Sequence, residues 1–278
     1  MLDFETLAML KRTALEIRKS TIREIAAFGS GHIGGSMSIV DLLTVLYYDE
    51  MNIDVNDPQK KDRDRFVCSK GHAGPAVYAT LASKGFFPED WLSTLNQGGT
   101  RLPSHCDMTK TPGIDFTGGS LGQGISAAVG IALGQKIQNI DAYTYCVIGD
   151  GESQEGSVYE AAETAGAWKL DNLIIFLDLN KQQLDDYTDN IIPAQELGAR
   201  WVSFGFNVIS IDGHDLSAIH YAIESAKSKK GKPTMIILNT NKSQGYIPGE
   251  GIKGNHSMSI TPEKAEEAIK ALEEREAL

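Results

Sequence analysis

Two apolar segments joined by a helical segment restrict the fold more than any other feature of this sequence. Residues 142–148 are apolar or β-prone throughout and stop at the Gly-Asp-Gly triplet 149–151, which is typical of a strand buried on both faces. Residues 152–169 place apolar and small residues at three- and four-residue intervals, so they predict a helix. A second strand over 173–177 leads to Asn180. Because a right-handed crossover makes the two strands parallel, their polar ends are expected at the same edge of the sheet.

Asp150 and Asn180 make this edge a candidate cation site. Open parallel sheets bind ligands beyond the carboxyl ends of their strands. Carboxylate and amide oxygens suit Mg²⁺ or Ca²⁺, and Mg²⁺ usually keeps positions open for water and phosphate oxygens. Gly151 lets the backbone approach a phosphate, and the N-terminus of the following helix favours anionic charge. Gly-Asp-Gly alone is more often a turn, but an Asn at the end of the next strand favours a ligand site.

Length and composition agree with a folded α/β protein. The 278 residues, 41% of them hydrophobic and 23% charged, suffice for one large domain that we expect to span 1–278. A formal charge of −11 disfavours a nucleic-acid surface. Cys68, Cys106 and Cys146 lack metal-like spacing and leave one thiol unpaired in any disulfide scheme, which favours a reducing cytoplasm. An acidic N-terminus and the lack of a long apolar run argue against export and membrane insertion.

A glycine-rich segment near the N-terminus contains a literal G-x-G-x-x-G at residues 29–34. A dinucleotide-binding loop with this pattern requires a preceding strand. Apolar residues instead recur at helical spacing from Leu7 to Ile25 and predict a long helix. We therefore reject a nucleotide loop and expect a glycine-rich loop that displays His32 near a ligand.

The rest of the chain alternates strands and helices without a domain boundary, which predicts a doubly wound α/β fold with a mostly parallel sheet. Ser38 is expected to cap a helix over 39–50. Residues 102–120 lack periodicity and predict a long ordered loop that carries His105. Further strands are expected at 65–69, 206–211 and 234–238, and further helices at 74–84, 121–136, 193–204, 216–229 and from Pro262, which Thr261 would cap.

Several motifs together resemble those of the transketolase family. The segment 149–156, Gly-Asp-Gly-Glu-Ser-Gln-Glu-Gly, followed by Asn180, resembles the thiamine diphosphate motif in its transketolase form. Other motifs occur in the family's order: Ser30-Gly31-His32, Lys70-Gly71-His72, Ser104-His105, residues 117–124 and Asp212-Gly213-His214-Asp215. The resemblance covers essentially the whole chain. It implies a thiamine-diphosphate-binding fold, of which this chain is the diphosphate-binding part.

The resemblance also implies the roles of individual residues. The cation would be held by Asp150, Asn180 and the backbone carbonyl of Gln182, with diphosphate oxygens and water completing its shell. Gly151 and His72 would bind the diphosphate, Leu121 and Leu184 would pack against the thiazolium ring, and at Gly119 the backbone would approach the cofactor.

Histidines and one glutamate are the candidate catalytic groups. Imidazoles titrate near neutral pH and suit proton transfer to sugar hydroxyls and carbonyls, and the resemblance places His32 and His105 next to the substrate. His256 is a further candidate, although Met258-Ser259 stands where the family usually has a His-Gly pair. Glu155 is either a solvated acid in the first turn of a helix or, by resemblance, an interface residue that shares protons with the glutamate that activates the cofactor. His214 is expected to tie down a turn.

The resemblance implies that the pyrimidine-binding and C-terminal domains lie on a separate chain. We expect the N-terminal subunit of a split transketolase that is inactive alone and forms an α₂β₂ assembly with that partner. The enzyme would transfer a two-carbon ketol unit between sugar phosphates. Three alternatives remain at this point: the α subunit of a 2-oxo acid dehydrogenase, a fragment of a deoxyxylulose-phosphate synthase, and a non-catalytic module with the cofactor fold. A truncated transketolase would also fit the chain length.

Overall fold

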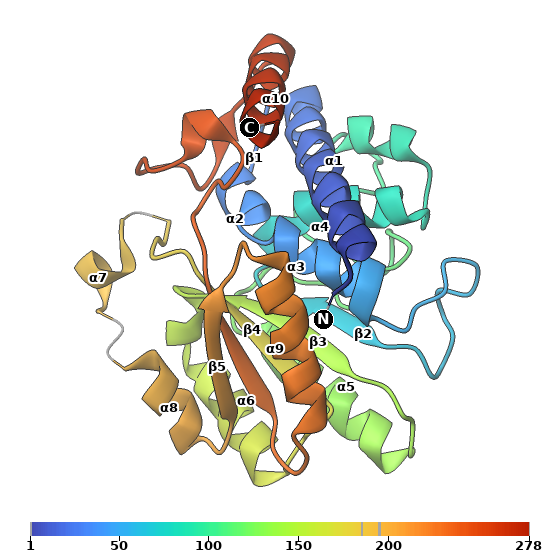
Figure 1. The fold of residues 1–278 in the computed structure, drawn as a ribbon, viewed down its shortest axis with the longest axis vertical. Helices are drawn as coiled ribbons and strands as arrows, with labels where there is room; N and C mark the ends of the chain where they lie inside the picture. The colour runs from blue at the N-terminus through green and yellow to red at the C-terminus, as the bar shows by residue number, and fades with distance from the viewer. Residues whose placement is uncertain (1, 185, 194–195, 278) are drawn as a thin grey trace.

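A five-stranded, entirely parallel sheet forms the centre of the molecule (Figure 1). The structure is a computed structural model, and it describes residues 2–184, 186–193 and 196–277. A second, two-stranded antiparallel sheet pairs β1 (Ser30–Gly31) with β7 (Met258–Ser259). The strands of the main sheet, in spatial order, are β2 (Arg65–Cys68), β3 (Thr144–Gly149), β4 (Leu173–Leu179), β6 (Thr234–Asn239) and β5 (Asn207–Asp212).

Helices cover both faces of the sheet, which confirms the predicted doubly wound fold. Alternate residues of β3 face the two cores: Tyr145 and Val147 lie in one, and Cys146 and Ile148 in the other. Burial on both faces explains why the strand sequences are apolar without alternation. The first core includes α1 (Phe4–Phe28), α3 (Val40–Val45), α4 (Gly74–Lys84) and α9 (Leu216–Ser228); the second includes α5 (Gln123–Ile137), α6 (Gly156–Ala167) and α8 (Leu197–Ser203).

The register of the sheet brings three strand ends to one edge. Gly149 of β3 pairs with Asp178 of β4, and Leu179 of β4 pairs with Asn239 of β6. The residues that follow these strands, including Asp150 and Asn180, therefore lie next to one another at the carboxyl edge, as the sequence predicted.

The predicted helix over 152–169 begins later than expected. Residues Glu152–Gln154 form a 3₁₀ turn, Glu155 is extended (φ −68°, ψ 140°), and α6 runs from Gly156 to Ala167. The Glu152 side chain is turned inward, where it accepts hydrogen bonds from the backbone N–H of Gly149 and Gly122. These inward bonds hold the turn away from the path of a continuous α-helix.

The helix predicted over 39–50 is confirmed, but the prediction that Ser38 caps it was wrong. Helix α2 (Ile33–Met37) precedes this segment. Helix α3 begins at Val40 with Ile39 at its N-cap position, and a π-helical turn over Leu46–Glu50 continues it. The Ser38 hydroxyl donates to the side chain of Asp178, a partner 140 positions away. This tertiary contact replaces the local capping bond that the sequence suggested.

Smaller elements complete the fold. The helix predicted over 193–204 includes residues 194–195, which lie outside the described residues, and the observed helix there is α8. A short helix, α7 (Thr188–Ile191), was not predicted. The expected helix from Pro262 is confirmed as α10 (Pro262–Glu276), capped by Thr261 Oγ1, which accepts from Lys264 N. Further 3₁₀ turns cover Gly71–Ala73, Glu89–Thr94 and Ile247–Gly249.

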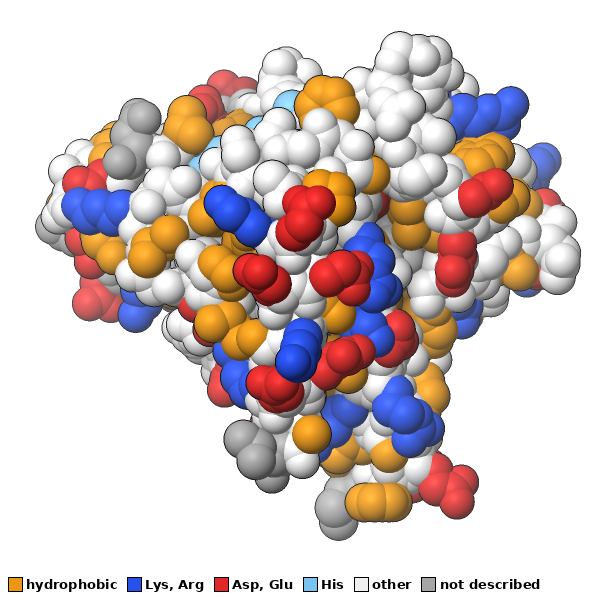
Figure 2. All heavy atoms as spheres, turned by 90° about the horizontal axis from the view of Figure 1, so that it is seen from above, with side chains coloured by type: hydrophobic (Ala, Val, Ile, Leu, Met, Phe, Trp, Pro, Cys, Tyr) orange, Lys and Arg blue, Asp and Glu red, His pale blue; other side chains and the backbone are white. Residues whose placement is uncertain are grey.

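Helices α1 and α10 pack together at one end of the molecule. Seen from that end, acidic and basic side chains intermingle over the surface (Figure 2). The ion pairs Arg23–Glu266 and Lys19–Glu273 connect the two helices. This face therefore carries both signs of charge. Among the described residues, the structure contains no helix with the length and apolar character needed to span a membrane.

Candidate active site

A cavity of about 300 Å³ opens at the carboxyl edge of the parallel sheet, beyond the ends of β3 and β4. It collects every residue that the sequence suggested for the site, although these residues come from seven separate stretches of the chain. The predicted residues that line it are His32, His72, His105, Gly119, Leu121, Asp150, Gly151, Glu155, Asn180, Gln182, Leu184 and His256.

Asp150 lies buried at the base of this cavity. Its Oδ1 accepts from Gly151 N over 2.8 Å, and its Oδ2 accepts from Lys181 N over 2.5 Å. Burial, and then the neighbouring charge of Asp178, raise the pKa of Asp150 to about 7. Among the residues that the structure describes, none forms an ion pair with Asp150. A buried carboxylate without such a partner is destabilised, so a bound cation would compensate for its charge.

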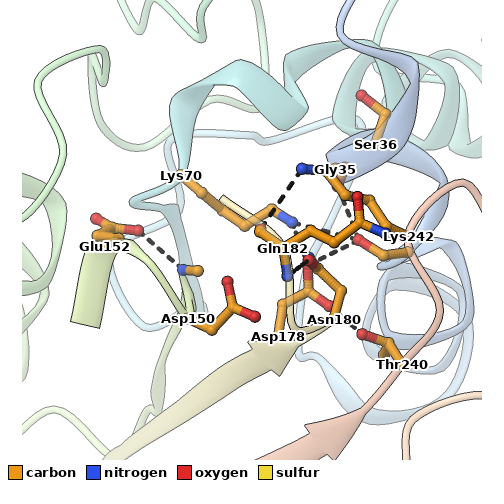
Figure 3. Close-up of polar contacts among 12 residues, drawn as sticks. Gly35, Ser36, Lys70, Asp150, Glu152, Asp178, Asn180, Gln182, Thr240 and Lys242 are labelled. Carbon is orange, nitrogen blue, oxygen red and sulfur yellow. Dashed lines mark hydrogen bonds and ion pairs between the residues drawn. The ribbon is translucent and has the colours of Figure 1, made fainter. Parts of the chain in front are cut away.

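Asn180 and Gln182 offer two further oxygens beside Asp150 (Figure 3). The Asn180 amide nitrogen donates to Asp178 Oδ2 over 2.8 Å, while its Oδ1 accepts from Gln182 N over 3.2 Å. The Gln182 carbonyl oxygen receives a long contact of 3.5 Å from Lys242 Nζ. A carboxylate, an amide oxygen and a backbone carbonyl form a hard-oxygen set that fits Mg²⁺ or Ca²⁺.

The two glycines of the predicted diphosphate region differ in their surroundings. A Cβ at Gly151 would lie 2.8 Å from Gln183 Cγ, so a side chain there would displace Gln183. A Cβ at Gly119 would meet nothing within 4 Å, which leaves its backbone open to the cavity. The N–H of Gly151 differs from the expectation, because it donates to Asp150 rather than pointing to an open position.

Four histidines from four separate segments form a cluster on the other side of the cavity. The ring centroid of His32 lies 5.8 Å from that of His72, 5.4 Å from that of His105 and 5.3 Å from that of His256. The ring centroids of His72 and His256 are 4.7 Å apart. The structure therefore brings His256 into the cluster despite the unusual residues that follow it.

Burial favours the neutral form of these histidines. It lowers the pKa of His32 and His105, and it lowers the pKa of His72 well below the ordinary value with help from the charge of Lys70. Burial and then the charge of Lys242 lower the pKa of His256 to about 3. The imidazoles are therefore neutral at pH 7, each with one N–H donor and one acceptor nitrogen.

Lys70 and Lys242 are site residues to which the sequence assigned no role. The Lys242 ammonium lies 3.0 Å from the Gln183 carbonyl oxygen, and burial followed by the charge of Lys70 lowers its pKa to about 8. Two ammonium groups on a cavity that also contains Asp150 favour an anionic ligand bound together with a cation. Lys70 could have been suspected from its place beside Gly71-His72, whereas Lys242 stands in a loop without a recognisable motif.

The mouth of the cavity has an apolar rim. Leu121 is 40% exposed and Leu184 is 64% exposed. Glu155 is also exposed there, and it precedes α6 instead of lying in its first turn, so the interpretation as a helical acid was wrong. The two leucines thus form an apolar edge beside the polar residues that line the cavity.

Two histidines lie outside the cavity. His214 Nδ1 is 2.9 Å from Asp41 Oδ2, and its Nε2 accepts from Asn241 N over 2.9 Å. It therefore connects α3 with the loop that follows β6, in agreement with its predicted structural role. His220, on α9, lies 2.7 Å from Asp49 Oδ2.

Comparisons with known proteins agree with this geometry. Residues 9–275 match the family described as "Transketolase, thiamine diphosphate binding domain". The chain is 51% identical to the 6-deoxy-6-sulfo-D-fructose transketolase subunit SqwG of Clostridium sp. (strain MSTE9), over 96% of this chain and 98% of that protein. It is 37% identical to an apulose-4-phosphate transketolase subunit of Phocaeicola vulgatus, over 93% and 92% of the two chains.

Full-length transketolases match over less than half of their length. The chain is 36% identical to rat transketolase over 97% of its own length and 43% of that protein. The solved transketolase from Leishmania mexicana superposes with a TM-score of 0.89 at 33% identity, over 94% of this chain and 41% of that one. These relatives favour a transketolase over a 2-oxo acid dehydrogenase subunit. The chain belongs to the transketolase family and carries its thiamine diphosphate binding domain.

Proposed function

We propose that this chain is the diphosphate-binding subunit of a two-chain transketolase and that Asp150, Asn180 and the Gln182 carbonyl hold its divalent cation. The observation that carries the proposal is the convergence of the family's motif residues on one cavity with an open apolar mouth. Mg²⁺ is the expected cation, and Ca²⁺ is a possible substitute, because both bind hard oxygen ligands.

Thiamine diphosphate, when bound, supplies the carbon nucleophile and the electron sink needed to break and form carbon–carbon bonds. This chain would bind its diphosphate through the cation, the open backbone at Gly119 and the side chain of His72. The Lys242 ammonium adds a positive charge on the same side of the cavity. Leu121 and Leu184 would contact the thiazolium ring, so their exposure would be lost in the assembled enzyme.

The histidine cluster would transfer protons to and from the sugar. His32, His105 and His256 are neutral and close together, so each can donate one hydrogen bond and accept another. We assign them to the hydroxyl and carbonyl oxygens of the substrate, where a neutral imidazole can accept a proton and return it. Their lowered pKa values keep the cluster uncharged beside two lysines.

A second chain would complete the site. The two relatives named as transketolase subunits are covered over 98% and 92% of their lengths, so both have the size of this chain. We propose a partner with the pyrimidine-binding and C-terminal domains, in an α₂β₂ assembly that covers Leu121 and Leu184. Glu155, exposed at the same mouth, would meet the partner's activating acid. Free, buried Cys68, Cys106 and Cys146 support a reducing, cytoplasmic location.

The substrates would be a ketose donor and an aldose acceptor with an anionic group. Sugar phosphates fit this class. The relative named for 6-deoxy-6-sulfo-D-fructose makes a sulfonated ketose a second donor to test.

The test is a ketol-transfer assay with Mg²⁺ and thiamine diphosphate. We expect no activity from the purified chain, and activity when a chain with the pyrimidine-binding and C-terminal domains is added. Activity of the chain alone would contradict the two-chain assembly. A mixture that binds the cofactor but transfers no ketol unit would contradict transketolase activity. In the active mixture, Glu155→Gln should slow turnover without changing the Mg²⁺ requirement, and unchanged turnover would remove Glu155 from the mechanism.

A further inference from the structure

The carboxylate of Asp178 is the most heavily hydrogen-bonded group beside the cavity. It lies near the end of β4 and is fully buried. Its Oδ2 accepts from Ser38 Oγ (2.7 Å), Lys70 Nζ (2.5 Å) and Asn180 Nδ2 (2.8 Å), and its Oδ1 accepts from Thr240 Oγ1 (2.5 Å). All four donors are side chains, so each depends on the residue type at its position.

These four donors come from four separate segments that meet at the carboxyl edge of the sheet. Figure 3 shows the side chains of Lys70, Asn180 and Thr240 grouped around Asp178. Ser38 follows α2, Lys70 follows β2, Asn180 follows β4 and Thr240 follows β6. The same segments carry Gly35, His72, Gln182 and Lys242, which line the cavity. A single carboxylate thus connects the segments that form much of the cavity wall.

Asp178 also determines which way the Asn180 amide faces. An ionised carboxylate only accepts hydrogen bonds, so the NH₂ group of Asn180 must face it. The amide oxygen then faces away from Asp178, toward Gln182 N at 3.2 Å and the cavity that Asp150 lines. A rotated amide would present NH₂ to the cation and lose the bond to Asp178.

Lys70 and Asp178 form an ion pair that is removed from solvent, with side chains 1% and 0% exposed. Such a pair is unstable if either partner is lost alone, because the remaining charge stays buried without compensation. The pair also fixes the position of the Lys70 ammonium at the wall of the cavity, which Lys70 lines.

We propose that Asp178 is a positioning residue for the cation site: it fixes the Asn180 amide with its oxygen toward the cation and holds Lys70 at the cavity floor. This inference rests on the proposed metal-dependent function. Asp178 would act through Asn180 and would not itself touch the cation. Groups that orient metal ligands in this way typically change metal affinity by roughly 10- to 100-fold when they are replaced.

The test compares Asp178→Asn with Thr240→Val in the assembled enzyme. Calorimetric titration gives the Mg²⁺ concentration at half-maximal thiamine diphosphate binding. The amide introduced by Asp178→Asn can present its own NH₂ to Asn180 and no longer enforces one amide orientation, so we expect the Mg²⁺ requirement to rise roughly 10-fold or more. Thr240→Val removes one hydrogen bond to the opposite oxygen of Asp178 and should leave that requirement unchanged. An equal rise in both variants, or none in Asp178→Asn, would overturn the proposal.

A second variant keeps the test informative if Asp178→Asn fails to fold. The double change Lys70→Met with Asp178→Asn removes both charges of the buried pair, so no unpaired charge stays behind. It should retain the raised Mg²⁺ requirement, and a wild-type requirement in the folded double variant would contradict the positioning role. Absence of Mg²⁺-dependent cofactor binding in the unmodified enzyme would instead refute the proposed function itself.

Discussion

The backbone N–H of Lys181 donates a hydrogen bond of 2.5 Å to the Oδ2 atom of Asp150, and this bond joins the loops that follow β3 and β4. Lys181 adopts a left-handed conformation (φ 64°), which is uncommon for a lysine and marks a locally constrained turn. The turn directs the chain so that Asn180, Gln182 and Asp150 line one cavity. Two loops that are far apart in the sequence thus form one candidate cation site.

Replacing Asp150 with Asn should abolish most Mg²⁺-dependent cofactor binding. An asparagine at this position lacks the charge that a divalent cation needs. We expect Mg²⁺ affinity to fall by more than the roughly 10- to 100-fold typical of residues outside the ligand set.

The Mg²⁺ affinity of the unmodified site should also depend on pH. Because the pKa of Asp150 is raised to about 7, the cation must displace a proton at lower pH, and Mg²⁺ affinity should fall about 10-fold per pH unit below 7.

Calorimetric Mg²⁺ titrations of the assembled enzyme between about pH 5.5 and pH 8 would measure both effects, because this range spans the ionisation of Asp150. A Mg²⁺ affinity that is independent of pH over this range, or an Asp150→Asn variant with unchanged affinity, would contradict the assignment of Asp150 as a ligand.

Replacing Lys242 with Met should weaken thiamine diphosphate binding at saturating Mg²⁺. A hydrogen bond to a charged group contributes about 1.5–3 kcal/mol, which corresponds to roughly 10- to 100-fold in affinity. Since the pKa of Lys242 is lowered to about 8, the wild-type affinity should also fall as the pH rises above 8, and Lys242→Met should lose this dependence. Lys270→Met, on the exposed face of α10, is a matched control and should bind normally.

The two predicted side-chain ligands of the cation could be found with a simple rule of parallel sheets. Asp150 and Asn180 each follow an apolar strand, and consecutive parallel strands end at the same edge. The histidines were accessible only through the family motifs, because glycine-rich loops carry no period from which a position in space follows. His256 shows this clearly, since its loop departs from the family pattern and yet reaches the cluster.

The groups that the sequence missed are those whose partners are distant in the chain. Asp178 stands within the apolar strand 173–179 and has no local feature that reveals donors from three other segments. Glu152 looks like an ordinary helical acid, but it is turned inward to bond the backbone at Gly122 and Gly149, which moves the start of α6 to Gly156. Periodicity predicts elements well because it depends on local burial, whereas such buried polar contacts depend on tertiary structure.

Two glycines of α5 should respond in opposite directions to replacement by Ala. A Cβ at Gly124 would lie 2.6 Å from Ser69 Cα, so Gly124→Ala should destabilise the fold by about 1–3 kcal/mol. A Cβ at Gly130 would meet nothing within 4 Å, so Gly130→Ala should stabilise the free chain by up to about 1 kcal/mol through better helix propensity. Urea unfolding of both variants would test the pair, and equal effects would contradict the packing at Ser69.

Replacing Glu24 with Leu should stabilise the chain. Glu24 lies on α1 with its side chain buried, and neither carboxylate oxygen has a hydrogen-bond partner among the residues that the structure describes. Burial, reinforced by the nearby Cys106, raises the pKa of Glu24 well above its ordinary value. An unsatisfied buried polar group costs about 1–3 kcal/mol, and an apolar side chain removes this cost. Glu5→Leu, at an exposed position of the same helix, should change stability by less than about 0.5 kcal/mol.

The pH dependence separates the charge of Glu24 from its polarity. Because its pKa is higher in the folded state than in the unfolded state, Glu24 is least unfavourable below about pH 4.5 and increasingly destabilises the fold as the pH rises toward the folded-state pKa. The advantage of Glu24→Leu should therefore grow between about pH 5 and pH 8. Glu24→Gln should remove this growth while leaving an unsatisfied amide, so it should be less stable than Glu24→Leu at every pH. Urea unfolding at several pH values measures all three proteins, and a constant difference between wild type and Glu24→Leu would show that the buried carboxylate does not change its ionisation.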